Sequence, residues 1–187
     1  MPSYFSQDAD TCGSDNVDYA CGAVSLANSL LLRGVSKSPK EILTELPRPS
    51  IAERGGLLPE ELCELSGACF GDGTHVTVAS PCLAHQLRPG DLMYVSSVVL
   101  KNIQGGCQYE ESPMDSHIVM VERITAKHIT VINPDCRVYG RGFKHYTWGR
   151  MHIKKEHLPQ VWKTTRADGH KTTRAAVLLR TKATSPA

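Results

Sequence analysis

The chain has 187 residues, a formal net charge of +2, and 41% hydrophobic against 21% charged residues. These values are typical of a globular domain and exclude a disordered chain, a collagen-like chain and a coiled coil. No apolar run approaches the roughly 18 residues of a membrane span, and the near-neutral charge gives no indication of a nucleic-acid partner. We expect one domain over residues 1–187, with flexible termini at 1–11 and 181–187.

Seven cysteines are the unusual feature of this composition, because an odd number in a chain of this length does not fit a small disulfide-stapled domain. The first ten residues lack the basic and apolar regions of a secretory signal, so we expect a cytoplasmic protein with free thiols. The cysteines are residues 12, 21, 63, 69, 82, 107 and 136. We expect one of these thiols to be reactive by function, and the sequence around each cysteine indicates which one.

Helices are expected in the first part of the chain. Apolar residues recur at three- and four-residue spacing over residues 21–33, which predicts a broadly buried helix that ends at Gly34. Residues 38–41 form a capping box with proline at the first helical position, so a short helix is expected from there through Leu46. A third helix is expected from Pro59 to near Gly67.

Strands are expected in the second part, because the period of the apolar residues changes to two. The runs 117–124 and 128–132 are joined by three residues and predict an antiparallel hairpin. The other expected strands are 75–78, 92–99 and 175–179. A long loop is expected at 101–115, an irregular segment at 137–150 and a short helix at 154–162. Helices followed by strands predict an α+β fold.

Cys21 is the candidate nucleophile, because it begins the apolar helix. The unpaired N–H groups and partial positive charge of a helix N-terminus favour thiolate over thiol. Gly22 leaves room for a substrate carbonyl near the backbone, and the backbone N–H of the nucleophile can face a developing oxyanion.

His117 and Asn133 are the candidate partners of this thiol. His117 begins a strand directly after the long loop, and the hairpin returns the chain so that residues near 133 lie beside it. Either Asn133 or Asp135 can accept the second ring N–H of the histidine and fix its tautomer. Cysteine, histidine and an orienting amide or carboxylate in this chain order suit thiol catalysis.

With these motifs in order, the sequence resembles the papain-like cysteine peptidases. The match rests on Cys21-Gly22 before the helix, His117 at the head of an alternating strand, and Asn133-Pro134 after the paired strand. The closest pattern is that of the bacteriocin-processing branch, and the resemblance covers most of residues 12–180. It implies a papain-like α+β fold, in which the nucleophile lies on a central helix packed against a C-terminal antiparallel sheet.

The resemblance implies a hydrolase that cleaves a peptide or amide bond through a Cys21 thioester. His117 would carry the proton and Asn133 would orient His117. The substrate would be a peptide or an acyl conjugate, with no cofactor, metal, nucleic acid or membrane involved. The same site, with an amine admitted in place of water, would be an acyltransferase or amide synthase.

The family places a glutamine six residues before the nucleophile, where its amide stabilises the oxyanion. This sequence has Asp15 there, and a carboxylate opposes an oxyanion. Asn16 carries a suitable amide and is the candidate that we favour; Gln7 is a more distant one.

Two other hypotheses come from residue clusters. One is a zinc-stabilised binding module built on a group within residues 63–85, although its spacings lack the Cys-x2-Cys pairs of structural zinc sites. The members of this group are Cys63, Cys69, His75, Cys82 and His85. The other is base stacking by the aromatic and basic residues of 137–150, for which packing within the protein is the simpler interpretation.

Overall fold

The computed structural model describes residues 4–7, 12, 20–45, 56–96, 116–134, 149–165 and 171–181. The helices of these ranges are α2 (Cys21–Leu32), α3 (Pro39–Thr44), α5 (Pro59–Phe70) and α7 (Leu158–Val161), with 3-10 turns η2 (Ala84–Gln86) and η4 (Lys155–His157). The strands are β1 (Thr74–Ala79), β2 (Leu92–Val95), β3 (His117–Ile124), β4 (His128–Ile132), β5 (Arg150–Lys154), β6 (Lys163–Thr165), β7 (Lys171–Thr173) and β8 (Ala176–Thr181). None of the described helices combines the length and apolar character needed to cross a bilayer.

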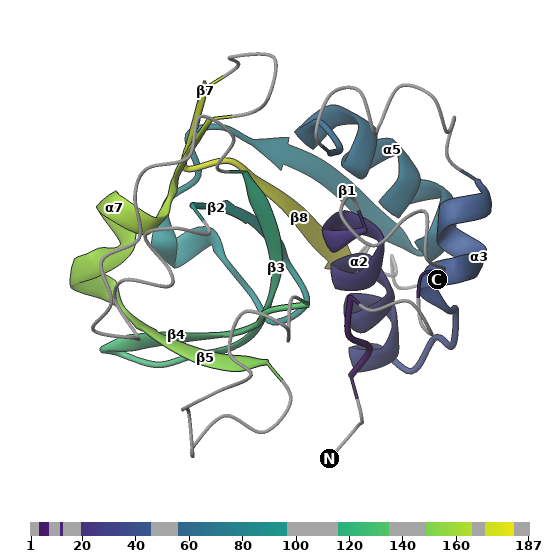
Figure 1. Cartoon of the computed structure of the whole chain (residues 1–187), viewed down its shortest axis with the longest axis horizontal. Helices are drawn as coiled ribbons and strands as arrows, with labels where there is room; N and C mark the ends of the chain where they lie inside the picture. Colours follow the sequence, from purple (N-terminus) through teal and green to yellow (C-terminus); the bar gives the residue numbers. More distant parts are fainter. Residues whose placement is uncertain are drawn as a thin grey trace, which may run out of the picture.

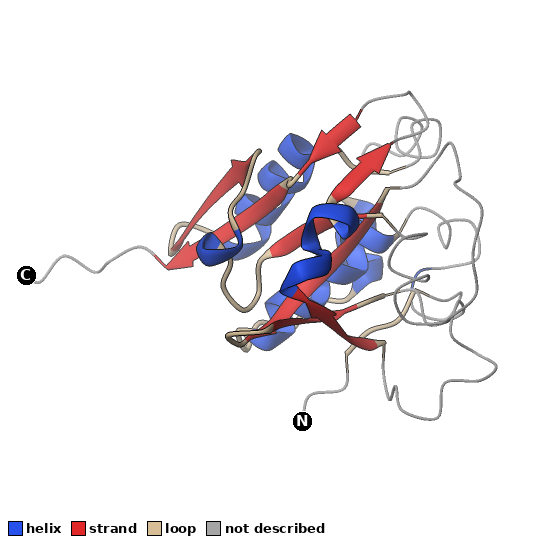
Figure 2. Cartoon of the chain, turned by 90° about the vertical axis from the view of Figure 1, so that its left-hand side faces the viewer, coloured by secondary structure: helices blue, strands red, loops and turns tan. Residues whose placement is uncertain are grey.

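The predicted α+β fold is confirmed. Six strands form an antiparallel sheet in the order β1-β8-β2-β3-β4-β5, and β6 and β7 form a separate two-stranded ribbon. The helices α2, α3 and α5 lie on one side of the sheet, and α7 lies on the other (Figure 1). In the perpendicular view, helices are visible on both sides of the strands (Figure 2).

The sheet is buried on both faces because its side chains alternate between two apolar clusters. In β2, Leu92 and Tyr94 pack with the residues of α2, α3 and α5, whereas Met93 and Val95 pack with those of α7. Strand β8 alternates in the same way. A sheet covered on both faces needs apolar residues at successive positions, which is what the central strands contain.

Local signals at two helix ends act as the sequence predicted. Gly34 follows the end of α2 with φ +78°, and the N–H of Val35 donates to the carbonyl of Leu30 at 2.9 Å. At α3, the Ser38 hydroxyl accepts from the Glu41 N–H and the Ser38 N–H donates to the Glu41 carboxylate, which completes the capping box.

Other element ends differ from prediction. Helix α3 ends at Thr44 rather than Leu46. Helix α5 continues past Gly67 to Phe70, because Gly71, with φ +67°, is the glycine that ends it. Strand β2 ends at Val95; residues 97–100 lie outside the described part of the chain. The predicted loop over 101–115 and most of the irregular segment 137–150 also lie outside it.

Three strands were not predicted from the sequence. Strand β5 occupies Arg150–Lys154, in which Met151 and Ile153 face the core while the alternate residues are more exposed. The helix expected over 154–162 is reduced to η4 and α7. Strands β6 and β7, both with the sequence Lys-Thr-Thr, pair with each other beyond α7.

Candidate active site

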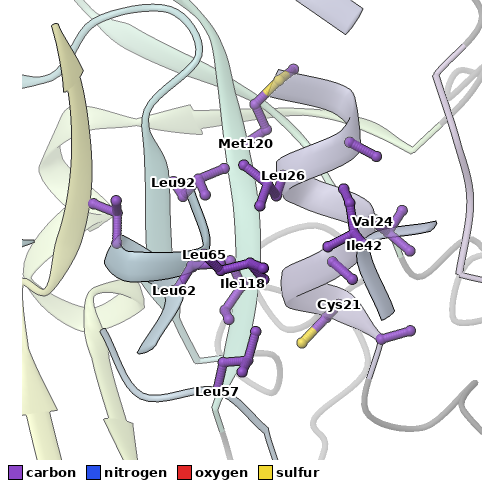
Figure 3. Close-up of a cluster of buried hydrophobic side chains, with 14 of the residues drawn as sticks. Cys21, Val24, Leu26, Ile42, Leu57, Leu62, Leu65, Leu92, Ile118 and Met120 are labelled. Atoms are coloured by element: carbon purple, nitrogen blue, oxygen red, sulfur yellow. The ribbon is translucent and has the colours of Figure 1, made fainter. Parts of the chain in front are cut away.

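Cys21 is the first residue of α2, as predicted. The N-cap residue of helix α2, Ala20, makes no side-chain hydrogen bond to the N–H groups of the first turn. The Gly22 N–H donates to the Cys21 sulfur. Figure 3 shows the sulfur at the N-terminal end of the helix, beside Leu57 and Ile118. Cys21 is 7% exposed, so the packing around it controls the chemistry of its thiol.

Strand β3 contacts the Cys21 thiol from the side opposite to helix α2. The Ile118 N–H donates to the Cys21 sulfur, and the Ile118 carbonyl accepts a 2.8 Å hydrogen bond from Ser25 Oγ, one turn further along α2. The peptide groups of one strand residue therefore hold the helix at two points. This arrangement sets the register of α2 against β3 and places His117, the residue before Ile118, next to the thiol.

His117 lies between Cys21 and Asn133. It is hydrogen-bonded to the thiol on one side, and on the other its Nε2 lies 2.7 Å from Asn133 Oδ1. Because an amide oxygen only accepts, Nε2 carries the proton and Nδ1 is the ring nitrogen available to the thiol. The structure thus brings together Cys21, His117 and Asn133, which are three of the site residues predicted from the sequence.

Opposing effects act on the thiol of Cys21. Burial, the largest of them, raises its pKa. The hydrogen bond with His117, the charge of His117, and the backbone N–H groups of Ile118 and Gly22 all lower it, and together they outweigh burial. The pKa of Cys21 therefore lies below that of an ordinary thiol, which is the property of a nucleophilic cysteine.

Three other cysteines show the opposite shift. Burial raises the pKa of Cys63 and Cys69, with nearby carboxylates adding to it, and it raises the pKa of Cys82 to about 11. Cys12 is also buried, in the core that contains α2. Of Cys21, Cys63, Cys69 and Cys82, Cys21 is the one whose surroundings favour the thiolate.

Gly22 has a packing role that the sequence did not reveal. A Cβ built on it would lie 2.9 Å from Leu57 Cδ1 and 3.1 Å from Ile118 Cδ1. A side chain at this position would therefore require the ends of the Leu57 and Ile118 side chains to shift. The expected role of Gly22, space for a substrate, is accompanied by a steric requirement of the folded core.

The candidates for the oxyanion are only partly described. Asn16 and Asp15 lie outside the described residues, as does Asp135. Gln7, the more distant candidate, is 5% exposed, and its backbone N–H donates to the Pro134 carbonyl at 2.7 Å. The structure therefore brings Gln7 next to the Asn133-Pro134 segment, although fourteen residues of chain separate it from Cys21.

The sequence analysis missed the residues that hold Asn133. The Asn133 N–H donates to the Gly149 carbonyl at 2.8 Å, and Nδ2 donates to Met151 Sδ at 3.4 Å. Both partners belong to β5 or the turn before it. The apolar residues Met151 and Ile153 alternate with polar ones, which is a strand signal. It lies directly after residues 137–150, the segment predicted to be irregular.

The proposed zinc ligands do not converge. Within the described residues, which include all five candidates between 63 and 85, no three His, Cys, Asp or Glu side chains form a group able to hold a metal ion. Cys63 and Cys69 belong to α5, His75 to β1 and His85 to η2.

Comparison with known proteins adds no family assignment to this geometry. No protein-family model matches the chain, and no curated protein matches it significantly in sequence.

Proposed function

We propose that this protein is a cysteine-dependent hydrolase that cleaves a peptide or amide bond through a thioester on Cys21. The observation that carries the proposal is the continuous row of Cys21, His117 and Asn133, in which a nearly buried thiol has a lowered pKa. A buried cysteine with a structural role shows the opposite shift, as Cys82 does.

The chemistry follows from this row. The Cys21 thiolate attacks the carbonyl carbon, and a C–S bond forms as the carbonyl oxygen becomes an oxyanion. The N–H groups at the start of α2 are suited to stabilise that charge. The tetrahedral intermediate collapses, and His117 Nδ1–H donates its proton to the leaving amine. His117 then accepts a proton from water, which attacks the thioester and releases the acid.

Asn133 holds the imidazole in the orientation this sequence requires. Its oxygen accepts from Nε2 in both charge states of the ring, so Nδ1 stays directed to the sulfur during both proton transfers. This is the arrangement of the papain-like cysteine peptidases, which the sequence resembles, and the α+β fold with α2 against the sheet is compatible with it.

A chromogenic acyl donor tests the proposal without knowledge of the natural substrate. Incubation with p-nitrophenyl acetate, acid quenching and intact-mass measurement should detect one acetyl group, mapped by peptide analysis to Cys21. Cys21→Ala should abolish this adduct, whereas Cys63→Ala should retain it. Acetylation spread over several thiols at similar rates would contradict a dedicated nucleophile.

The fate of the acyl group then separates hydrolysis from acyl transfer. Decay of the acetyl-enzyme at a rate that does not depend on added amine indicates a hydrolase. Decay that accelerates with a primary amine, with amide as the product, indicates the acyltransferase chemistry that the same three residues support.

A further inference from the structure

Residues 4–7 form a short extended segment, here called the N-terminal strap, that contacts both α2 and the sheet. It lies beside α2 (Figure 1). The Tyr4 hydroxyl donates to Glu122 on β3 at 3.2 Å, and the Gln7 N–H donates to the Pro134 carbonyl after β4. Residues 1–11 were expected to form a flexible terminus, but the strap is attached to elements far away in the sequence.

Asn28 holds the centre of the strap. Its Oδ1 accepts from the Phe5 N–H at 2.7 Å, and its Nδ2 donates to the Phe5 carbonyl at 3.0 Å. One side-chain amide therefore pairs with both polar groups of a single residue, as a neighbouring strand would. Asn28 is fully buried in the middle of a helix, although asparagine is a poor helix former. The two hydrogen bonds to Phe5 offset the free-energy cost of burying its polar amide.

The position of Asn28 links the strap to the nucleophile. It lies seven residues after Cys21, which is about two helical turns, so both residues lie on the same face of α2. From Phe5 the strap continues to Gln7 and ends in the bond to Pro134, the residue after Asn133. The strap thus spans from the helix that carries the thiol to the turn that carries the amide facing His117.

The Asn133-Pro134 turn lies just past the end of the sheet, where contacts from two sides hold it. The last residue of β4 in the ladder is Ile132, paired with Arg150. Beyond it, Asn133 is held by Gly149 and Met151 from the β5 side. The bond from Gln7 to Pro134 ties the same turn to α2 through the strap and Asn28.

We propose that Asn28 is a positioning residue for the active site: by docking the N-terminal strap, it holds the Asn133-Pro134 turn against His117, so that the thiol site is fully formed only while the strap is docked. This inference rests on the proposed function. It makes the strap a point of control, because any event that displaces residues 4–7 would weaken the activation of Cys21.

The test uses the full chain and measures the rate of Cys21 alkylation by iodoacetamide between pH 5 and 9. Asn28→Leu removes both bonds to Phe5 and keeps a side chain with the same branching and number of heavy atoms. Ser29→Ala is the matched control, since Ser29 is equally buried on α2 but donates to the Gly90 carbonyl at 2.6 Å, away from the strap. Thermal unfolding of each variant reports stability separately.

Asn28→Leu should move the inflection of the alkylation profile toward that of an ordinary thiol. At a pH below both inflections, the rate should fall about threefold for each unit of that shift, because a tenfold loss of thiolate is partly offset by greater nucleophilicity. Ser29→Ala should lower the melting temperature and leave the profile unchanged.

A second pair of variants breaks the same contact from the strap. Phe5→Pro removes the N–H that donates to Asn28, whereas Phe5→Leu keeps it. Phe5→Pro should reproduce the Asn28→Leu profile, and it decides the question if Asn28→Leu does not fold. Wild-type profiles in both Asn28→Leu and Phe5→Pro would overturn the inference and leave the proposed function standing. An ordinary thiol profile in the wild type would overturn both.

Discussion

His117 Nε2 and Asn133 Oδ1 are 2.7 Å apart, although His117 is the first residue of β3, Asn133 follows the end of β4, and both lie beyond the paired residues of the hairpin. The last pair recorded near this end of the hairpin is Met120 with Ile132. The contact is therefore made by side chains past the ladder, and Gly149 and Met151 hold the asparagine in place from β5. The pair has the geometry of a histidine with a fixed tautomer, hydrogen-bonded to a thiol.

Replacement of Asn133 tests the value of this contact. Asn133→Ala should reduce the rate of Cys21 acetylation by p-nitrophenyl acetate about ten- to a hundredfold, because the imidazole loses its fixed orientation. Asn133→Asp keeps an oxygen that accepts from Nε2 and should stay within a few-fold of the wild type. Equal rates for the alanine and aspartate variants would show that the acceptor has no role.

Gly22→Ala should destabilise the protein through a steric clash. The new Cβ meets Leu57 Cδ1 at 2.9 Å, so the end of the Leu57 side chain must shift within a packed core, at a cost of about 1 kcal/mol. Gly67→Ala is the matched control, because nothing lies within 4 Å of its added Cβ in the middle of α5. It should stabilise the protein by about 0.5–1 kcal/mol. Urea denaturation of both variants measures the difference, and a neutral Gly22→Ala would contradict the close approach.

Among the described carboxylates, Asp91 is the one whose replacement should lower the stability of the protein most. It is fully buried and accepts from the Arg88 and Leu179 N–H groups, and from Arg180 Nη1 at 2.7 Å. Asp91→Asn removes the charge that pairs with Arg180 and should cost about 2–3 kcal/mol.

The matched control for Asp91 is a surface ion pair. Glu45 lies 2.6 Å from Lys37 but is 43% exposed, so Glu45→Gln should cost less than about 1 kcal/mol. Chemical denaturation at neutral pH measures both variants. Similar losses for Asp91→Asn and Glu45→Gln would contradict the structural importance of the buried carboxylate.

Local sequence signals predicted much of the fold because they act over a few residues. Ser38 and Glu41 cap α3, and Gly34 ends α2, through contacts within one turn. The hairpin of 117–124 and 128–132 was predicted with its observed bounds, since alternation and a short connection suffice to define it. Gly67 misled the prediction of α5, because a glycine signals a helix end only where the backbone takes positive φ, as Gly71 does.

Features of the site that depend on contacts between distant parts of the chain could not be predicted from local sequence signals. Cys21, His117 and Asn133 were identified from chain order and helix or strand ends. Asn28 and the strap were not, because a buried asparagine within an apolar helix has no local signature that identifies a partner at residue 5. The steric requirement at Gly22 likewise depends on Leu57, which approaches from a distant part of the chain.

The pH dependence of thiol alkylation tests the central claim most directly. Iodoacetamide reacts with thiolates, and the pKa of Cys21 is lowered while burial raises the pKa of Cys63, Cys69 and Cys82. As the pH falls from 9 to 6, the other thiols protonate first and Cys21 keeps its thiolate longer, so its selectivity should increase. At pH 6, peptide mapping should show Cys21 modified at least about tenfold faster than Cys63 or Cys69. A Cys21 that loses reactivity in parallel with Cys63 and Cys69 as the pH falls would contradict the account.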